Sequence, residues 1–222
     1  MTPPRRAAAE GLGTALLLAA VVGSGIMGER LSGGNEAVAL LANAIATGCA
    51  LVALIAGLGD ISGAHLNPVV TMAMAARGQL RRQEVAPYLL AQVLGAVIGV
   101  MLAHLMFDLQ VLQISEKART SFGQWLSEAV ATFGLLLVVL SGLRTRTSLM
   151  PFLVAAYITA AYWFTASTSF ANPAVTLARS LTNTFAGISP NHVLPFIVAQ
   201  MMGAWAALAV DGYLSGMRND GA

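Results

Sequence analysis

Charge is what this sequence has least of. Only 10% of its 222 residues are charged, 57% are hydrophobic, and the mean hydropathy is +0.73. A soluble domain carries about 25% charged residues, so most of this surface does not face water. The sequence contains 1 cysteine, Cys49, which excludes a disulfide within the chain. We expect Cys49 to be packed as a small hydrophobic side chain.

Six long stretches of the chain are almost free of charge. A spanning helix needs about 20 apolar residues, so we expect an integral membrane bundle of six transmembrane helices with no sizeable soluble domain. The first stretch continues into Gly23-Ser24-Gly25 without a convincing cleavage site, so we interpret it as a span rather than a signal peptide. The stretches are residues 11–28, 37–59, 85–107, 129–143, 149–178 and 192–210.

The few charges are unevenly distributed between the two sides of the predicted bundle. One side has most of the arginines, whereas the other has Arg30, Lys117 and Arg119, offset by four acidic residues. The positive-inside rule therefore predicts that both termini are cytoplasmic. The arginines of the cytoplasmic side are Arg5, Arg6, Arg77, Arg81, Arg82, Arg144, Arg146 and Arg218.

The sequence also repeats itself. Three features recur in the same order at similar offsets, which indicates a duplication, with residues 1–110 and 111–222 as the two halves of a single domain. Each half has three spans, an odd number, so the second half must be inverted in the membrane. The matched features are Glu10-x-x-x-Thr14 with Glu128-x-x-x-Thr132, Asn67-Pro-Val-Val-Thr-Met-Ala73 with Asn172-Pro-Ala-Val-Thr-Leu-Ala178, and Ala91-Gln92-x-x-Gly95-Ala96 with Ala199-Gln200-x-x-Gly203-Ala204.

Each half contains one Asn-Pro pair, in re-entrant loops that we expect at residues 59–78 and 167–184. Asparagine suits a helix N-cap and proline the first helical position. A single Asn-Pro pair usually marks an ordinary turn, but two at matching repeat positions predict short helices that meet near the bilayer midplane. Their positive ends would oppose cations there. The carboxamides of Asn67 and Asn172 would donate hydrogen bonds to a neutral solute, so the pattern predicts a passive pore.

Over essentially its whole length the chain resembles the aquaporin and glycerol-facilitator (major intrinsic protein) family. The resemblance rests on Ser62-Gly-Ala-His65-Leu-Asn67-Pro68-Val69-Val-Thr71, on Asn172-Pro173-Ala174-Val-Thr176, and on the other two repeated motifs. It implies an all-α membrane protein of six transmembrane helices plus two re-entrant half-helices, with no enzymatic activity, cofactor or metal. It also implies a homotetramer in the inner membrane of a bacterium. The resemblance further implies a ladder of backbone carbonyls along the pore, from Gly63, Ala64, His65, Thr168, Ser169 and Phe170.

The chain departs from the family's pattern at the constriction. In most of the family an arginine directly follows the second Asn-Pro-Ala, where this chain has Val175. Counting from the Asn-Pro turns assigns the other constriction positions to Thr47, Ala160 and Ser169. Small side chains and no arginine there predict a wide constriction for water plus glycerol-like solutes, or for neutral metalloid hydroxides such as arsenous acid. Segment 174–185 resembles a bacterial subgroup associated with arsenic resistance. The alternative is a water-selective channel.

Four polar side chains allow two interpretations each. Glu10 and Glu128 are expected to accept hydrogen bonds from the re-entrant loops, although intramembrane carboxylates also occur in proton relays. Arg179 lies one turn beyond Val175, which predicts a place in the outer vestibule; a solvated arginine at a loop end is the alternative. His65 is expected to brace its loop, with a pH-sensitive gate as the alternative.

Two rival classes are weaker. A proton-coupled secondary transporter would also have inverted repeats, but it needs a titratable group at the midplane, where this sequence places asparagines. A membrane enzyme would need a nucleophile with its base, a metal-ligand cluster or a phosphate-binding loop, and none of these motifs is found. The expected partners are the lipid bilayer and small neutral solutes, and not nucleic acid.

Overall fold

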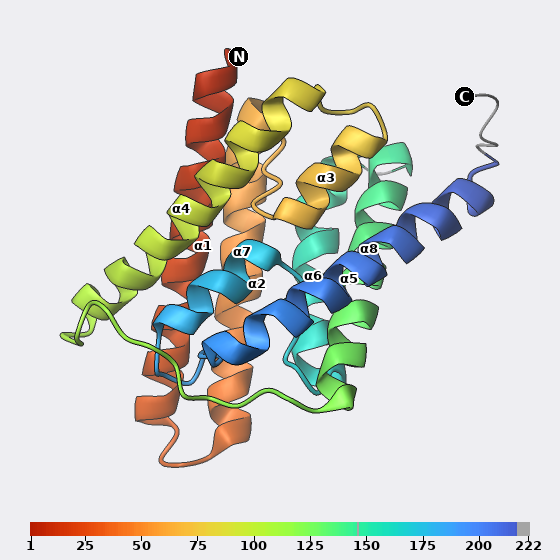
Figure 1. The fold of residues 1–222 in the computed structure, drawn as a ribbon. Helices are drawn as coiled ribbons and strands as arrows, with labels where there is room; N and C mark the ends of the chain where they lie inside the picture. The colour runs from red at the N-terminus through yellow and green to blue at the C-terminus, as the bar shows by residue number, and fades with distance from the viewer. Residues whose placement is uncertain (146, 217–222) are drawn as a thin grey trace.

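The computed structural model describes residues 1–145 and 147–216, and this part of the chain is helical without strands (Figure 1). Six of its helices are long and apolar enough to cross a membrane, as the sequence predicted. Two further helices are short. The long helices are α1 (Pro3–Leu31), α2 (Glu36–Ser62), α4 (Arg82–Met106), α5 (Phe122–Thr145), α6 (Met150–Phe164) and α8 (Val193–Leu214), and the short ones are α3 (Pro68–Ala76) and α7 (Pro173–Ala178). Helix α6 reaches a spanning length of 18 residues together with the 3₁₀ turn Thr147–Leu149 that precedes it.

The predicted spans and the described helices differ in one place. The fifth apolar stretch, residues 149–178, is not one span, because α6 ends at Phe164 and an irregular segment leads from there to α7. That segment, residues 165–172, consists mostly of small uncharged residues. Composition alone therefore did not separate it from the helices on either side. Arg146 and Arg218, which we assigned to the cytoplasmic side, lie outside the described residues.

The long helices pack in the same way in both halves of the chain. Helix α1 packs against α4 and α2, and α5 packs against α8 and α6 (Figure 1). Glycines allow the closest approaches. A Cβ atom on Gly95 of α4 would collide with the carbonyl oxygen of Gly11, and one on Gly203 of α8 with that of Ala129. Small residues at such contacts let two helix backbones approach closely in lipid.

The outward faces of these helices carry large apolar side chains. On α4 these are Leu90, Leu94, Ile98 and Leu102, which recur every four residues and are all exposed. Cys49 also faces outward, so our expectation that it is packed was wrong. The inner face of α2 includes Thr47 and Leu51, and residue 49 points to the opposite side because each helical residue turns the direction by about 100°.

The short helices α3 and α7 begin side by side in the interior of the bundle. In Figure 1, α3 runs from this meeting point toward the end of the bundle where the N-terminus lies, and α7 runs toward the opposite end. Asparagine and proline start both helices in the expected way. The Oδ1 atom of Asn67 accepts a hydrogen bond from the backbone N–H of Val69, and that of Asn172 accepts from Ala174 and Val175.

Candidate functional site: a cavity between the two Asn-Pro loops

A cavity of about 530 Å³ lies inside the bundle. Side chains of α1, α2, α5 and α6 form its walls, and both Asn-Pro loops reach it. At one end it is lined by Met1, Arg6 and Asp60, which belong to the end of the bundle that carries the N-terminus (Figure 1). Asn67 and Asn172 both line it. The cavity therefore follows the path that the sequence predicted for a pore.

The two asparagines link the loops to each other. The Nδ2 atom of Asn67 donates to the carbonyl oxygen of Ala171 at 2.8 Å, and the Nδ2 atom of Asn172 donates to that of Leu66 at 2.8 Å. A carboxamide nitrogen carries two N–H groups, so one donor of each asparagine is left over. Both residues line the cavity.

The loops before α3 and α7 have an unusual backbone. Five non-glycine residues have a positive φ, which L-residues rarely adopt and which costs of order 1–3 kcal/mol per residue. Such strain persists only where the surroundings over-determine it. The five residues are Ala64 (46°), Leu66 (51°), Thr168 (63°), Ser169 (49°) and Ala171 (46°).

The predicted carbonyl ladder lies in these two strained segments. Gly63, Ala64 and His65 line the cavity from the first loop, and Ser169 and Phe170 line it from the second. Thr168 is not among the residues that line it. The structure therefore brings five of the six predicted ladder residues to the cavity.

Two fully buried carboxylates hold the strained loops in place. Glu10 accepts hydrogen bonds from the backbone N–H groups of His65 (2.9 Å) and Leu66 (2.7 Å). Glu128 accepts from those of Phe170 and Ala171, both at 2.8 Å. Backbone donors inside a membrane protein need such acceptors, and a charged acceptor makes the stronger hydrogen bond.

A glutamine supports each carboxylate. Gln92 of α4 donates from Nε2 to Glu10 and to Thr71, both at 2.8 Å. Gln200 of α8 donates to Glu128 at 2.7 Å and to Thr176 at 2.8 Å. These are the residues of the repeated Ala-Gln motif, and their matched contacts give that motif a physical reason.

Three of the four predicted constriction residues line the same cavity. Thr47, Ser169 and Val175 all line the cavity and are buried. Ala160 does not line it and is exposed on the outer face of α6, so the prediction for Ala160 was wrong. Residue 162 lies two positions beyond residue 160 in α6, so their side chains point about 200° apart. The inward position is that of Tyr162, whose hydroxyl oxygen lies 3.2 Å from that of Thr47.

Tyr162 was not recognised from the sequence. Counting backward from Asn172 crosses the irregular segment 165–171, whose length along the pore depends on its backbone angles. The available signal was the pattern of the helix itself, because Val154, Ile158 and Tyr162 recur every four residues and all three line the cavity.

Arg179 is buried rather than solvated. Only 2% of its surface is exposed, its Nε atom donates to the carbonyl oxygen of Ala186, and it lines the cavity together with Val175. The interpretation as a solvated loop-end arginine is therefore wrong. The prediction that Arg179 shares a helix face with Val175 agrees with its place in the cavity wall. Position 175 has no arginine, but a guanidinium group is still present in this wall.

A second arginine lies beside this region in the segment between α4 and α5. Arg119 is 6% exposed and donates from Nε to the carbonyl oxygen of Gly187 and from Nη1 to that of Ser167, both at 3.0 Å. Burial lowers the pKa of Arg119 to about 10. This is still far above neutral, so Arg119 keeps its positive charge.

His65 lines the cavity and contacts α3, as a loop-bracing residue would. Its ring lines the cavity, and Nδ1 lies 3.1 Å from the hydroxyl of Thr71, a contact that connects the loop to α3. Within residues 1–145 and 147–216, no three His, Cys, Asp or Glu side chains come together as a metal site requires.

Two buried carboxylates form ion pairs with partly exposed arginines at the end of the bundle that carries the N-terminus, and the sequence did not indicate these pairs. Glu84 of α4 accepts from Arg6 at 2.8 Å and from Arg81 at 3.2 Å. Asp211 of α8, 2% exposed, accepts from Arg77 at 2.8 Å and from Arg144. The second cluster ties the segment after α3 and the end of α5 to α8.

Comparison with known proteins agrees with this geometry. The family model described as "Major intrinsic protein" matches residues 2–163. "Aquaglyceroporin AqpS" of Rhizobium meliloti is 57% identical over 210 residues, which cover 95% of this chain and 90% of that protein. "Probable aquaporin AqpM" of Archaeoglobus fulgidus is 31% identical over 182 residues, covering 75% and 73%. The X-ray structure of the aquaglyceroporin from Plasmodium falciparum has the same fold, with a TM-score of 0.70, 18% identity and coverage of 96% and 95%.

Proposed function

The chain belongs to the major intrinsic protein family, whose members are passive channels rather than enzymes, and on that premise we propose that it conducts small neutral solutes, glycerol-like polyols included. It is a multi-pass membrane protein, because six of its helices are long and apolar enough to cross a membrane. The observation that carries the proposal is the cavity lined by both asparagines and by the small side chain of Val175.

The residues at the constriction favour solutes larger than water. Val175, Thr47 and Ser169 present short side chains to the cavity. Polar atoms in a mainly apolar wall orient a solute without binding it so tightly that it cannot leave. The 57% identical relative is called an aquaglyceroporin, which supports glycerol as a solute. Neutral metalloid hydroxides such as arsenous acid are compact molecules with several hydroxyl groups, and we propose them as further solutes.

The transport path uses both loops. We propose that the spare N–H groups of Asn67 and Asn172 donate to the solute at the midpoint, and that carbonyls of residues 63–65 and 169–170, which line the cavity, accept from its hydroxyl groups on either side. Glu10 and Glu128 keep those carbonyls in place through the neighbouring N–H groups. The helix N-termini that meet at the asparagines oppose cations.

The remaining features of the proposal concern assembly. We propose two inverted repeats, residues 1–110 and 111–222, that together form one channel domain. The matched carboxylate and glutamine contacts in the two halves support this division. We further propose a homotetramer in the inner membrane of a bacterium. Both termini lie in the cytoplasm in this proposal, and the distribution of arginines supports that orientation.

Stopped-flow light scattering on proteoliposomes tests this function, with empty liposomes of the same lipid as the control. We expect glycerol and arsenous acid to enter faster than into empty liposomes. Water permeation without glycerol or arsenous acid flux would show a water-selective channel instead. Repeating the glycerol measurement with an imposed proton gradient separates a channel from a coupled transporter, because flux through a channel depends on the solute gradient alone.

A further inference from the structure

The side chain of Arg179 turns back toward the start of α7. Arg179 follows α7 directly, in a turn of 3₁₀ helix over Arg179–Leu181. Its guanidinium carbon lies 3.4 Å from the centre of the Phe170 ring, and Phe170 precedes α7 in the chain. In a helix the Cα–Cβ bonds tilt toward the N-terminus, so a long side chain covers the turn before its own Cα. The surface that Arg179 covers is therefore the turn that contains Val175.

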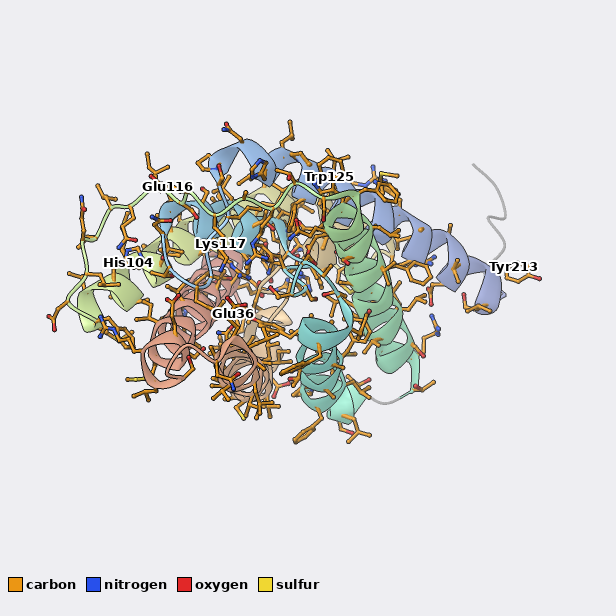
Figure 2. The ribbon with its side chains drawn as sticks, turned by 90° about the horizontal axis from the view of Figure 1, so that it is seen from below. Glu36, His104, Glu116, Lys117, Trp125 and Tyr213 are labelled. Atoms are coloured by element: carbon orange, nitrogen blue, oxygen red, sulfur yellow. The ribbon has the colours of Figure 1, made fainter. Side chains whose placement is uncertain are left out.

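Arg179 also marks the outer end of the cavity. It lines the cavity together with Thr47 and Tyr162, whose hydroxyls are 3.2 Å apart. No residue of segments 107–121 or 182–192 is among the lining residues. Figure 2 views this end of the molecule, with Lys117 on the segment that crosses it between α4 and α5. Among the cavity-lining residues, Arg179 is therefore the one that is nearest in sequence to segment 182–192.

The hydrogen-bonding capacity of this guanidinium is largely unused. Nε donates to Ala186, while Nη1 and Nη2 have no hydrogen-bond partner among the described residues. The ion pairs found in residues 1–145 and 147–216 involve Glu84 and Asp211, and neither contacts Arg179. A buried charge is costly unless it is paired and hydrogen-bonded. Stacking on the Phe170 ring compensates in part, and the residue that carries the unused donors lines the cavity.

Arg119 provides a contrast at the same ring. Its guanidinium carbon lies 4.9 Å from the centre of the Phe170 ring, but two of its nitrogens donate to backbone carbonyls and it does not line the cavity. Arg119 is thus committed to the protein, whereas Arg179 has free donors at the path of the solute.

We propose that Arg179 is the specificity-determining residue of the outer constriction, where its two Nη groups donate hydrogen bonds to a pair of adjacent oxygen atoms of the solute. Arg179 and Val175 line the same cavity. The fork geometry of a guanidinium matches two neighbouring acceptors, so the solutes it favours are vicinal polyols and polyhydroxides. Its positive charge also opposes cations at this point. The inference rests on the channel function proposed above and names the residue that discriminates between solutes.

Two solutes of similar size separate this role from simple sieving. Glycerol has adjacent hydroxyl groups, whereas trimethylene glycol carries its two hydroxyls on the terminal carbons. The ratio of their channel-mediated permeabilities is measured in proteoliposomes, after subtraction of the flux into empty liposomes. We expect Arg179→Gln and Arg179→Lys each to lower the glycerol preference about three- to tenfold, because a site built to hydrogen-bond a substrate loses discrimination when the donor pair is lost. Arg179→Lys keeps the charge and the long stem, so it serves if Arg179→Gln does not fold.

Arg119→Gln is the matched control and is expected to leave the ratio unchanged. An unchanged ratio in a folded Arg179 variant overturns the inference, and so does an equal loss in Arg119→Gln, which would indicate a general distortion of this end of the channel. Wild-type glycerol flux no faster than into empty liposomes contradicts the proposed function itself, and the inference with it. Normal wild-type flux with an unaltered ratio contradicts the inference alone.

Discussion

The substitution Glu10→Gln tests whether a buried carboxylate holds the first loop. In the wild-type protein Oε1 accepts from the hydroxyl of Ser62 (2.7 Å) and from the N–H of His65 (2.9 Å). Oε2 accepts from the N–H of Leu66 (2.7 Å) and from Gln92 (2.8 Å). Glutamine replaces one of these oxygens with an NH₂ group, which meets donors whichever way the amide is turned.

The best arrangement for the variant still leaves a donor without an acceptor. If the NH₂ group takes the place of Oε2, Gln92 can turn its own amide, because its Oε1 atom has no partner. The N–H of Leu66 has no such remedy. An unpaired buried N–H costs about 1–3 kcal/mol, and the remaining hydrogen bonds lose the strength that a charged acceptor gives, so the total is about 2–5 kcal/mol.

Thermal unfolding in detergent measures this effect. For a chain of this size 1 kcal/mol shifts the midpoint by about 2–4 °C, so Glu10→Gln should lower it by roughly 5–15 °C. Glu128→Gln should have a comparable effect, because Glu128 accepts from Phe170, Ala171 and Gln200. Glu116→Gln, an exposed carboxylate, is the control. A midpoint for Glu10→Gln equal to that of Glu116→Gln would show that the carboxylate of Glu10 does not hold the first loop.

Three further predictions follow from the packing and the cavity wall. Gly203→Ala should lower the unfolding midpoint because the added Cβ would collide with the carbonyl oxygen of Ala129, whereas Gly57→Ala, with open space around it, should not. Equal midpoints for the two variants would contradict the close approach of α5 and α8. Asp211→Asn should lower the free energy of unfolding by about 1–3 kcal/mol in the same assay. This is less than for a fully buried pair, because the side chain of Arg144 is 39% exposed. An unchanged stability would contradict a stabilising role of these ion pairs. Thr47→Phe should reduce glycerol flux about tenfold or more. Ala160→Phe should leave the flux unchanged, since Thr47 lines the cavity and Ala160 does not. A loss of flux in Ala160→Phe would show that Ala160 does belong to the constriction.

The features of the site that follow from local chemistry were predictable from the sequence. An asparagine N-cap followed by proline is a rule about adjacent residues, and both half-helices start where it predicts. The contacts of Glu10 and Glu128 were expected because irregular backbone inside a membrane requires acceptors. Their matched positions in the two halves pointed to the same loops that the structure shows them holding.

The features that depend on the path of irregular segments were not predictable. Ala160 was assigned by counting across a loop whose strained backbone angles determine how far it extends, and Tyr162 took its place. Helical spacing placed Arg179 on the face of Val175, but its burial depends on the return of the chain at Ala186. The partners of Asp211 come from two segments far away in the sequence, Arg77 and Arg144, which no local pattern connects to α8.

The glycerol-to-water permeability ratio, measured for the wild-type protein and for Val175→Phe, shows whether this chain is a wide channel for neutral solutes. Phenylalanine narrows the constriction without placing a second guanidinium beside Arg179. We expect the wild type to conduct glycerol well above empty liposomes and Val175→Phe to lower the ratio about tenfold or more, because a pore sieves by diameter as well as by polarity. A wild type that conducts water alone, or a ratio that Val175→Phe leaves unchanged, would contradict a wide channel for neutral solutes.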